Sequence, residues 1–298
     1  MLTTAAVLQP LFHEPIEQIA YLDPGYSGHA SDVWLVKTAS EEQVVRASRW
    51  TEAPNREFWW GCLDLFGIDP RRMLHFQANA AMLSSIEDIP VPRVQAHVTM
   101  GDREYLVVEK MYGSACPPFA GQSDKLLRQL GVWLARVHTQ RCDYFGNLAL
   151  TQTDRIQCFH DRLSETVRQL VERDYADDSK ITGKLDAMIR ELGSLSVPDH
   201  FCPVFIDLDS SQFLVQDGML SAVVDVEAYA VGPRELDFVG LEYVLDERSA
   251  ASFLEGYSTV LAPPDISDYR AVYRYFYRLL GVQGSVDLDE WFAQRALF

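Results

Sequence analysis

Cysteine is scarce and scattered in this sequence of 298 residues. The cysteines are odd in number and widely spaced, at Cys62, Cys116, Cys142, Cys158 and Cys202. No C-x-x-C pair occurs, which excludes a disulfide framework and a cysteine-rich zinc site and is typical of a reduced, cytoplasmic protein. The sequence also lacks an apolar run of about 18 residues, so we expect no transmembrane helix. Residues 1–18 lack the basic segment of a signal peptide.

Basic residues are few as well. Lysine and arginine total 26 against 43 acidic residues, for a net charge of −17. Phosphate backbones and anionic lipid surfaces repel such a chain unless one face is strongly basic, and no dense basic run occurs. We therefore expect neither a nucleic-acid partner nor a membrane partner. Two explanations of the acidic excess remain, solubility and attraction of a cationic small substrate.

The composition is that of a globular protein, with 48% hydrophobic and 23% charged residues. The first third is rich in β-branched and aromatic residues and in turn signals, which predicts a strand-rich region with two helices. The predicted strands are 15–22, 31–37, 42–48, 93–98 and 103–111, and the predicted helices are 54–66 and 70–86.

The rest of the chain has mainly helical periodicity, at 122–139, 154–174 and 178–192 and again from Glu235 onward. Residues 203–226 return to strand character and form a hairpin with Asp217-Gly218 in its turn. These patterns predict an α+β fold of two lobes joined by a hinge near 109–114. The lobes are a small antiparallel-sheet N-lobe, 1–112, and a mainly helical C-lobe, 113–298.

Carboxylates flank the predicted hairpin. Asp207 precedes it, Asp225 follows it, and Gln212 stands five positions after Asp207. A hairpin folds back on itself, so its ends meet and these groups can face one cavity. Phosphoryl transfer uses one carboxylate to orient or deprotonate a hydroxyl, and another carboxylate with an amide to hold Mg²⁺. The alternative is that they are ordinary polar residues at strand ends.

Small and hydroxyl residues fill the turn at 25–31, between two predicted strands. In such a turn the backbone N–H groups of Ser27 and Gly28 can approach phosphates. Arg46 lies on the following strand, where a cation can neutralise phosphate charge. The alternatives are a plain hairpin turn and a solvated surface charge.

The order of these features resembles the aminoglycoside phosphotransferase family, which is related to choline kinases and protein kinases. The resemblance runs from about residue 15 to about residue 285. It rests on the turn, the cation, the segment Glu109-Lys-Met-Tyr-Gly113 and the two aspartates. Three further matching segments are IPVPRV (89–94), LARVH (134–138) and VGPRELDFVG (231–240).

The resemblance implies a kinase-like two-lobed fold and transfer of a phosphoryl group from ATP, with Mg²⁺, to a hydroxyl of a small molecule. It implies that Asp207 is the catalytic residue and that Gln212 and Asp225 are metal ligands. It also implies that Arg46 contacts phosphate, and that Glu109 and Met111 offer backbone groups to adenine. Asp237 then supports the catalytic loop, and acidic residues of the helical lobe bind the acceptor.

Three positions depart from the family pattern. Phe205 replaces the histidine of the catalytic loop, and Gln212 replaces an asparagine. Asn79 aligns with the helix glutamate that pairs with the strand cation, so that ion pair is expected to be absent. These departures support an alternative function, that of a catalytically impaired pseudokinase acting as a binding or scaffold protein.

Overall fold

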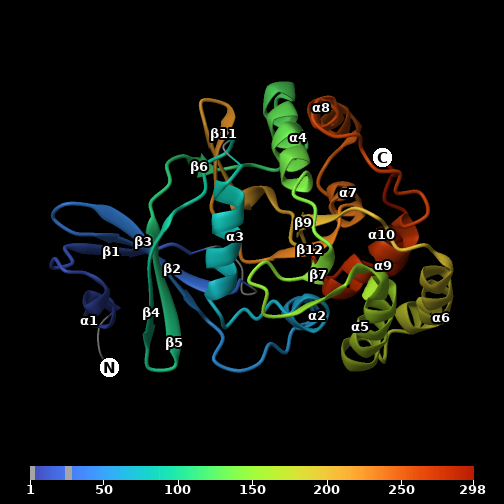
Figure 1. Cartoon of the computed structure of the whole chain (residues 1–298), viewed down its shortest axis with the longest axis horizontal. Helices are drawn as coiled ribbons and strands as arrows, with labels where there is room; N and C mark the ends of the chain where they lie inside the picture. The colour runs from blue at the N-terminus through green and yellow to red at the C-terminus, as the bar shows by residue number, and fades with distance from the viewer. Residues whose placement is uncertain (1–3, 24–28, 87) are drawn as a thin grey trace.

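The smaller lobe is built on one antiparallel sheet. A computed structural model describes residues 4–23, 29–86 and 88–298, and Figure 1 shows this sheet at one end of the molecule. Its strand order is β1-β2-β3-β5-β4. The strands are β1 (Gln18–Tyr21), β2 (Ser31–Lys37), β3 (Glu42–Ser48), β4 (Val94–Met100) and β5 (Arg103–Glu109). The predicted ranges 31–37 and 42–48 match β2 and β3.

Side chains of β3 point alternately to the two faces of this sheet, and different elements pack on each face. Val45 and Ala47 point to one face, where they pack with α1 (Thr4–Leu8) and the 3₁₀ turn η1 (Gln9–Leu11). Neighbouring residues of a strand point to opposite faces, so Arg46 points to the other one. That face carries α3 (Leu74–Ser84), which lies between the sheet and the second lobe (Figure 1).

Helix α2 (Glu57–Phe66) follows β3 in sequence but packs on the second lobe, against α5 (Phe159–Asp174) and α9 (Arg270–Leu280). Gly61 permits this contact, because a Cβ at that position would lie 2.4 Å from Leu280 Cδ2. A helix from the N-terminal segment therefore forms part of the wall of the second lobe. The boundary near residue 112 stays a prediction.

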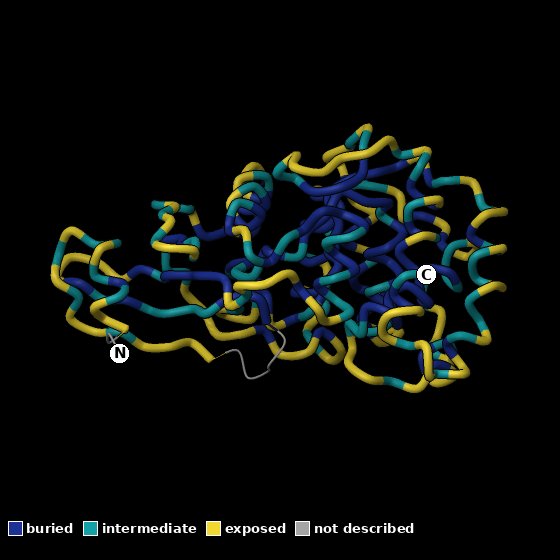
Figure 2. Tube along the Cα trace, turned by 90° about the horizontal axis from the view of Figure 1, so that it is seen from below, coloured by how far each residue is buried: buried dark blue, intermediate teal, exposed yellow. Residues whose placement is uncertain are grey.

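The larger lobe is mainly helical, and buried segments concentrate in it (Figure 2). Its further helices are α4 (Asp124–His138), α6 (Ser179–Ser194), α7 (Glu235–Leu241), α8 (Glu247–Tyr257) and α10 (Leu288–Phe292). Among the described residues, no helix has the length and apolar character needed to cross a membrane. All five cysteines are free thiols.

Two small sheets interrupt these helices. The first has the order β11-β10-β6 and consists of β6 (Ser114–Ala115), β10 (Phe213–Gln216) and β11 (Met219–Val223). The second has the order β8-β7-β12-β9 and consists of β7 (Tyr144–Gly146), β8 (Thr153–Arg155), β9 (Phe201–Phe205) and β12 (Tyr229–Pro233). The predicted hairpin is confirmed as β10–β11. Its turn residues Asp217 and Gly218 have φ of 53° and 73°, as a two-residue type I′ turn requires.

The sequence patterns missed the short strands β6, β7, β8 and β12. The strands β6, β7 and β8 have two or three residues, too few for alternation to register. The predicted helix 154–174 begins only at Phe159, because β8 and the 3₁₀ turn η2 (Ile156–Cys158) occupy the residues before it.

Candidate active site

Asp237 anchors the loop that carries Asp207. The Phe205 N–H, at the end of β9, donates to Asp237 Oδ1 at 2.7 Å, and Asp237 Oδ2 lies 2.9 Å from His138 Nε2. Asp237 and His138 are completely buried. A buried carboxylate held from two sides fixes the end of the strand, so the support expected of Asp237 is present in the structure.

Phe205 occupies the position that histidine takes in the family pattern, and it is held by aromatic packing. Its ring centroid lies 3.9 Å from that of Tyr229 and 5.8 Å from that of Phe213, which is stacked at 15°. The Trp133 ring meets it edge-on at 5.9 Å. Such ring pairs add stabilisation beyond their buried area. Aromatic packing therefore supports this end of the loop.

The β10–β11 hairpin brings Asp207 and Asp225 to one cleft. The Val224 N–H donates to the Gln212 carbonyl at 2.8 Å, which closes the base of the hairpin. Asp207, Gln212 and Asp225 all line a cleft of about 500 Å³ between the lobes, together with Arg46 of β3. The sequence prediction that these groups face one cavity agrees with this arrangement, and their catalytic roles stay predictions.

Burial sets the protonation of Asp207. It raises the pKa of this carboxyl to about 7, with smaller contributions from the negative charges of Asp225 and Asp209. A general base works best when its pKa lies near the working pH, because it is then ionised and still holds a proton well. Asp207 thus combines a position in the cleft with the pKa of a proton acceptor at neutral pH.

Arg46 is held by two carboxylates of the opposite lobe. Its Nη2 lies 3.1 Å from Glu227 Oε1 and 3.2 Å from Asp225 Oδ1, and its Nη1 donates to the Val224 carbonyl at 3.2 Å. The Phe76 ring lies beneath the guanidinium at 4.8 Å. Burial raises the pKa of Glu227 to about 7 although Arg46 opposes the shift. These contacts join the two lobes at the cleft.

Asn79 makes no ion pair with Arg46, as its amide side chain requires, and it has another role. Its Nδ2 donates to the carbonyl of Val226 at 2.7 Å and also reaches the Glu227 carbonyl at 3.4 Å. The helix thus holds the backbone of the segment that supplies Glu227 to the cation. Sequence reasoning missed the role of Glu227. The available signal was its place two residues after Asp225.

Gln212 and Asp225 form a donor set that fits Mg²⁺. The Gln212 amide nitrogen donates to the Asp207 carbonyl, which leaves the amide oxygen to act as a ligand. The Asp225 side chain is 37% exposed in the cleft. Mg²⁺ commonly takes one or two protein oxygens and completes its octahedron with phosphates and water. The described residues contain no cluster of three or more His, Cys, Asp or Glu side chains able to enclose a metal.

The residues predicted to contact the nucleotide differ in where the structure places them. Ser27 and Gly28 lie outside the described residues, whereas Ser31 and Val33 of β2 line the cleft. Glu109 and Met111 do not belong to the described lining of the cleft. The Glu109 N–H donates to the Arg93 carbonyl at 3.0 Å, and its carboxylate pairs with Arg93 Nε at 2.9 Å. The proposed adenine contacts of Glu109 and Met111 stay predictions.

Comparison with known proteins gives a family and a fold. Residues 26–275 match the model of the phosphotransferase enzyme family. No curated protein matches the chain by sequence.

Three solved structures illustrate the shared fold. Macrolide 2'-phosphotransferase MphH from Brachybacterium faecium is 15% identical, with a TM-score of 0.63 over 94% of this chain and 89% of that one. A putative fructosamine-3-kinase from Haemophilus somnus is 15% identical, with a TM-score of 0.58 over 90% and 83%. Spectinomycin phosphotransferase, in complex with ADP and spectinomycin, is 11% identical, with a TM-score of 0.61 over 93% and 84%.

Proposed function

The chain belongs to the phosphotransferase enzyme family, and from this premise we propose that it transfers the γ-phosphoryl group of ATP to a hydroxyl of a small molecule. One observation carries the proposal: Asp207, Gln212, Asp225 and Arg46 line the same cleft, although they come from both lobes. A reaction that works by positioning and charge neutralisation needs such a convergence of groups.

Asp207 is the proposed proton acceptor. The acceptor hydroxyl gives its proton to the Asp207 carboxylate while its oxygen bonds to the γ-phosphorus. The bond from that phosphorus to the β–γ bridging oxygen breaks, and ADP departs with the electron pair. Asp207 lines the cleft and has a pKa raised to about 7, so it can take the proton of an alcohol bound beside it at neutral pH.

Asp225, Gln212 and Arg46 are proposed to manage the phosphate charge. Mg²⁺ held by Asp225 and Gln212 would neutralise the β- and γ-phosphate oxygens. Arg46 adds a cation on the wall formed by β3, and Glu227 and Phe76 orient its guanidinium. An arginine supplies several donors in a fixed plane, which suits phosphate oxygens.

The pseudokinase alternative loses part of its support at Asn79. The cation of β3 keeps a carboxylate partner, because Glu227 contacts it at 3.1 Å. Phe205 replaces the histidine of the family pattern, and aromatic packing holds it in place. We therefore favour an enzyme over a binding or scaffold protein.

Thermal unfolding with ATP and Mg²⁺ tests the proposal. A ligand at 100 times its Kd stabilises the folded state by about 2.7 kcal/mol, which raises the Tm of a chain of this size by several degrees. We expect this shift with ATP and MgCl₂, and a smaller one when EDTA removes the metal. Asp225→Asn should lose the Mg²⁺-dependent part, whereas Asp217→Asn in the hairpin turn should keep it. Absence of any shift and of phosphorylated product would leave only the scaffold alternative.

A further inference from the structure

A second cavity adjoins Asp207 on the side away from the β3 wall. It has a volume of about 270 Å³ and shares Asp207, Gln212 and Asp225 with the main cleft. It then extends between α2 and the residues after α9, where its walls include Phe58, Trp59, Ala228 and Val282. The nucleotide phosphates belong on the side of Arg46. The cavity on the other side of Asp207 is therefore where the acceptor hydroxyl can approach.

We propose that this cavity takes a compact, uncharged alcohol that carries one aromatic or similarly flat apolar group. The inference rests on the proposed phosphotransferase function and assigns its substrate class. Phe58 and Trp59 meet edge to face, with ring centroids 5.0 Å apart and planes at 86°. Together with Ala228 and Val282, they form apolar walls near the catalytic carboxylate. Aromatic rings of a ligand favour such edge-to-face and offset contacts.

The volume limits the size of the acceptor. An apolar cavity of about 150 Å³ is large enough to hold benzene. The 270 Å³ found here is room for one ring with a short hydroxyalkyl chain. An aminosugar of several rings would extend beyond this space.

The charges around the cavity also disfavour a cationic acceptor. Its carboxylates are Asp207, Asp225 and Glu227, and the last two already contact Arg46. His29 is held neutral, because burial and the nearby Arg49 lower its pKa. Among the described lining residues, Asp207 is the carboxylate outside the Arg46 pairs, and it is needed for the reaction. A buried ammonium group would have to compete for these carboxylates with Arg46 or with the reaction, which is costly.

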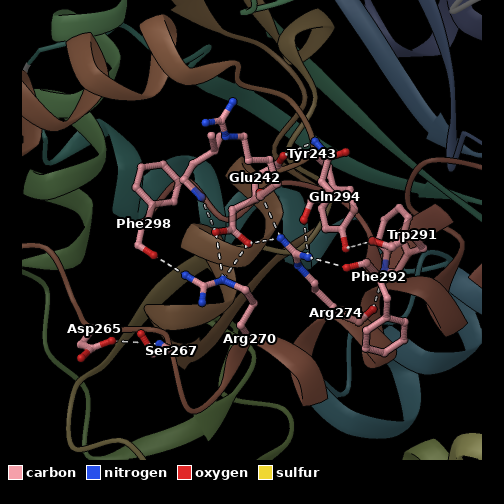
Figure 3. Close-up of polar contacts among 12 residues, drawn as sticks. Glu242, Tyr243, Asp265, Ser267, Arg270, Arg274, Trp291, Phe292, Gln294 and Phe298 are labelled. Carbon is pink, nitrogen blue, oxygen red and sulfur yellow. Dashed lines mark hydrogen bonds and ion pairs between the residues drawn. The ribbon is translucent and has the colours of Figure 1, made fainter. Parts of the chain in front are cut away.

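Seven acidic residues from the C-terminal part of the helical lobe lie outside this cavity. Figure 3 shows Glu242, which is completely buried and is bound by Arg274 at 2.7 Å and by Arg270 at 3.1 Å. Most of the others also have partners outside the cavity: Asp246 caps α8, Glu247 pairs with Arg295, Glu255 with Arg128, Asp265 with the Ser267 N–H, and Asp287 and Asp289 with Lys180. None of these seven belongs to the described lining of the cavity or the cleft. The net negative charge can attract a cation to the surface, but these seven residues contribute no carboxylate to the described lining of the cavity.

The first experiment compares two kinds of acceptor with the full chain, ATP and MgCl₂. One set contains neutral aryl alcohols, such as 2-phenylethanol and 3-phenylpropanol. The other probe is spectinomycin, which carries ammonium groups. Formation of phosphate ester is followed by ³¹P NMR and mass spectrometry. We expect ester from at least one aryl alcohol and none from spectinomycin. Ester from spectinomycin alone would overturn the proposed substrate class and leave the phosphotransferase function intact.

The second experiment uses a matched pair of variants. Ala228 lines only the acceptor cavity, and Ala115 lines only the main cleft. Ala228→Leu should raise the KM for the aryl alcohol about tenfold or more, since small volume changes in an apolar pocket have effects of that size. Its KM for ATP should stay the same. Ala115→Leu should raise the KM for ATP and leave the KM for the aryl alcohol unchanged. Equal effects of both variants on both substrates would contradict the assignment of the cavity.

A third variant covers the case in which Ala228→Leu does not fold. Phe58 is partly exposed and can accept a charged residue more easily. Phe58→Glu should weaken binding of the aryl alcohol about tenfold or more, because it removes a ring and places a charge in the wall.

Direct binding separates this inference from the proposed function. Saturation-transfer NMR reports binding of the aryl alcohols to the protein without nucleotide. If ATP and Mg²⁺ produce no thermal shift, the phosphotransferase proposal fails. Binding of an aryl alcohol that Ala228→Leu or Phe58→Glu abolishes would then still support the cavity assignment. Lack of binding by every aryl alcohol, in the presence of a normal ATP shift, would overturn the substrate class alone.

Discussion

Replacement of Asp207 by asparagine should make the protein more stable at alkaline pH while removing its activity. Burial raises the pKa of this carboxyl from an ordinary value of 3.8 to about 7. The unfolded chain therefore releases the proton first as the pH rises, and each step toward pH 7 favours unfolding. The stability contributed by the protonated group is complete below about pH 4 and is lost by about pH 7. Asparagine has nearly the same shape and does not ionise.

The magnitude follows from the size of the shift. About three pKa units, at about 1.4 kcal/mol each, correspond to roughly 4 kcal/mol between pH 4 and pH 8. We expect Asp207→Asn to be a few kcal/mol more stable than the wild type at pH 8, with the difference vanishing near pH 4. Turnover should fall by about 10²–10⁴, the typical effect of losing a positioned base. The KM for ATP should change little, because Asp207 is proposed to face the acceptor and not the nucleotide.

Urea unfolding at several pH values measures this difference. Asp217→Asn is the control, since it makes the same chemical change in the exposed turn of the β10–β11 hairpin. In the active wild type, turnover should rise with pH through about 7, as the base loses its proton. A stability difference that does not vary with pH, or an asparagine variant that is less stable at pH 8, would refute the raised pKa. The assignment of Asp207 as a base at neutral pH would then lose its physical support.

Further predictions concern the metal, the lobe contact and the helix packing. Gln212→Asn should require a higher Mg²⁺ concentration for ATP binding, because the shorter amide cannot keep its hydrogen bond to the Asp207 carbonyl and also reach the metal. Titration of Mg²⁺ at fixed ATP measures this requirement. An unchanged Mg²⁺ dependence would show that Gln212 is no ligand. Asn79→Glu should destabilise the fold by about 1–3 kcal/mol, since it removes a donor to a buried carbonyl and adds a carboxylate beside Glu227. Adding Glu227→Gln to it should recover part of that loss in urea unfolding, and a purely additive double variant would contradict the contact. Gly131→Ala should destabilise by about 1–3 kcal/mol or more, because its Cβ would lie 2.1 Å from a carbonyl oxygen of α8. Gly183→Ala, which meets open space on α6, should stabilise by up to about 1 kcal/mol, and equal effects of the two alanines would show that α4 and α8 are not in close contact.

Local sequence patterns predicted most of the helices and strands and the proximity of Asp207 and Asp225. The hairpin turn at Asp217-Gly218 allowed the convergence of Asp207 and Asp225 to be inferred, because a two-residue turn brings the strands that flank it together. The strands β2 and β3 and the helix α4 follow from periodicity in the same way. Short strands such as β12 escaped because their pairing with β9 is formed between segments separated in sequence.

Contacts between distant segments were not predictable in this way. Glu227 meets Arg46 from 181 positions away, and no local pattern marks that pair. The family pattern placed a glutamate at Asn79, so the sequence indicated a missing ion pair. The structure instead pairs the cation with another carboxylate.

The sequence by itself determined the α+β class, the order of the lobes, the phosphotransferase resemblance and the identity of the central carboxylates. These properties depend on turns, periodicity and motif order, which are encoded over short stretches of chain. Only the tertiary structure decided that α2 leaves the small lobe to form a cavity wall with Phe58 and Trp59. Only it showed that the surroundings of Asp207 raise its pKa and that Glu242 of the helical lobe pairs with Arg274. Burial, pKa and pairing depend on which distant side chains surround a group, and that is known only once the chain has folded.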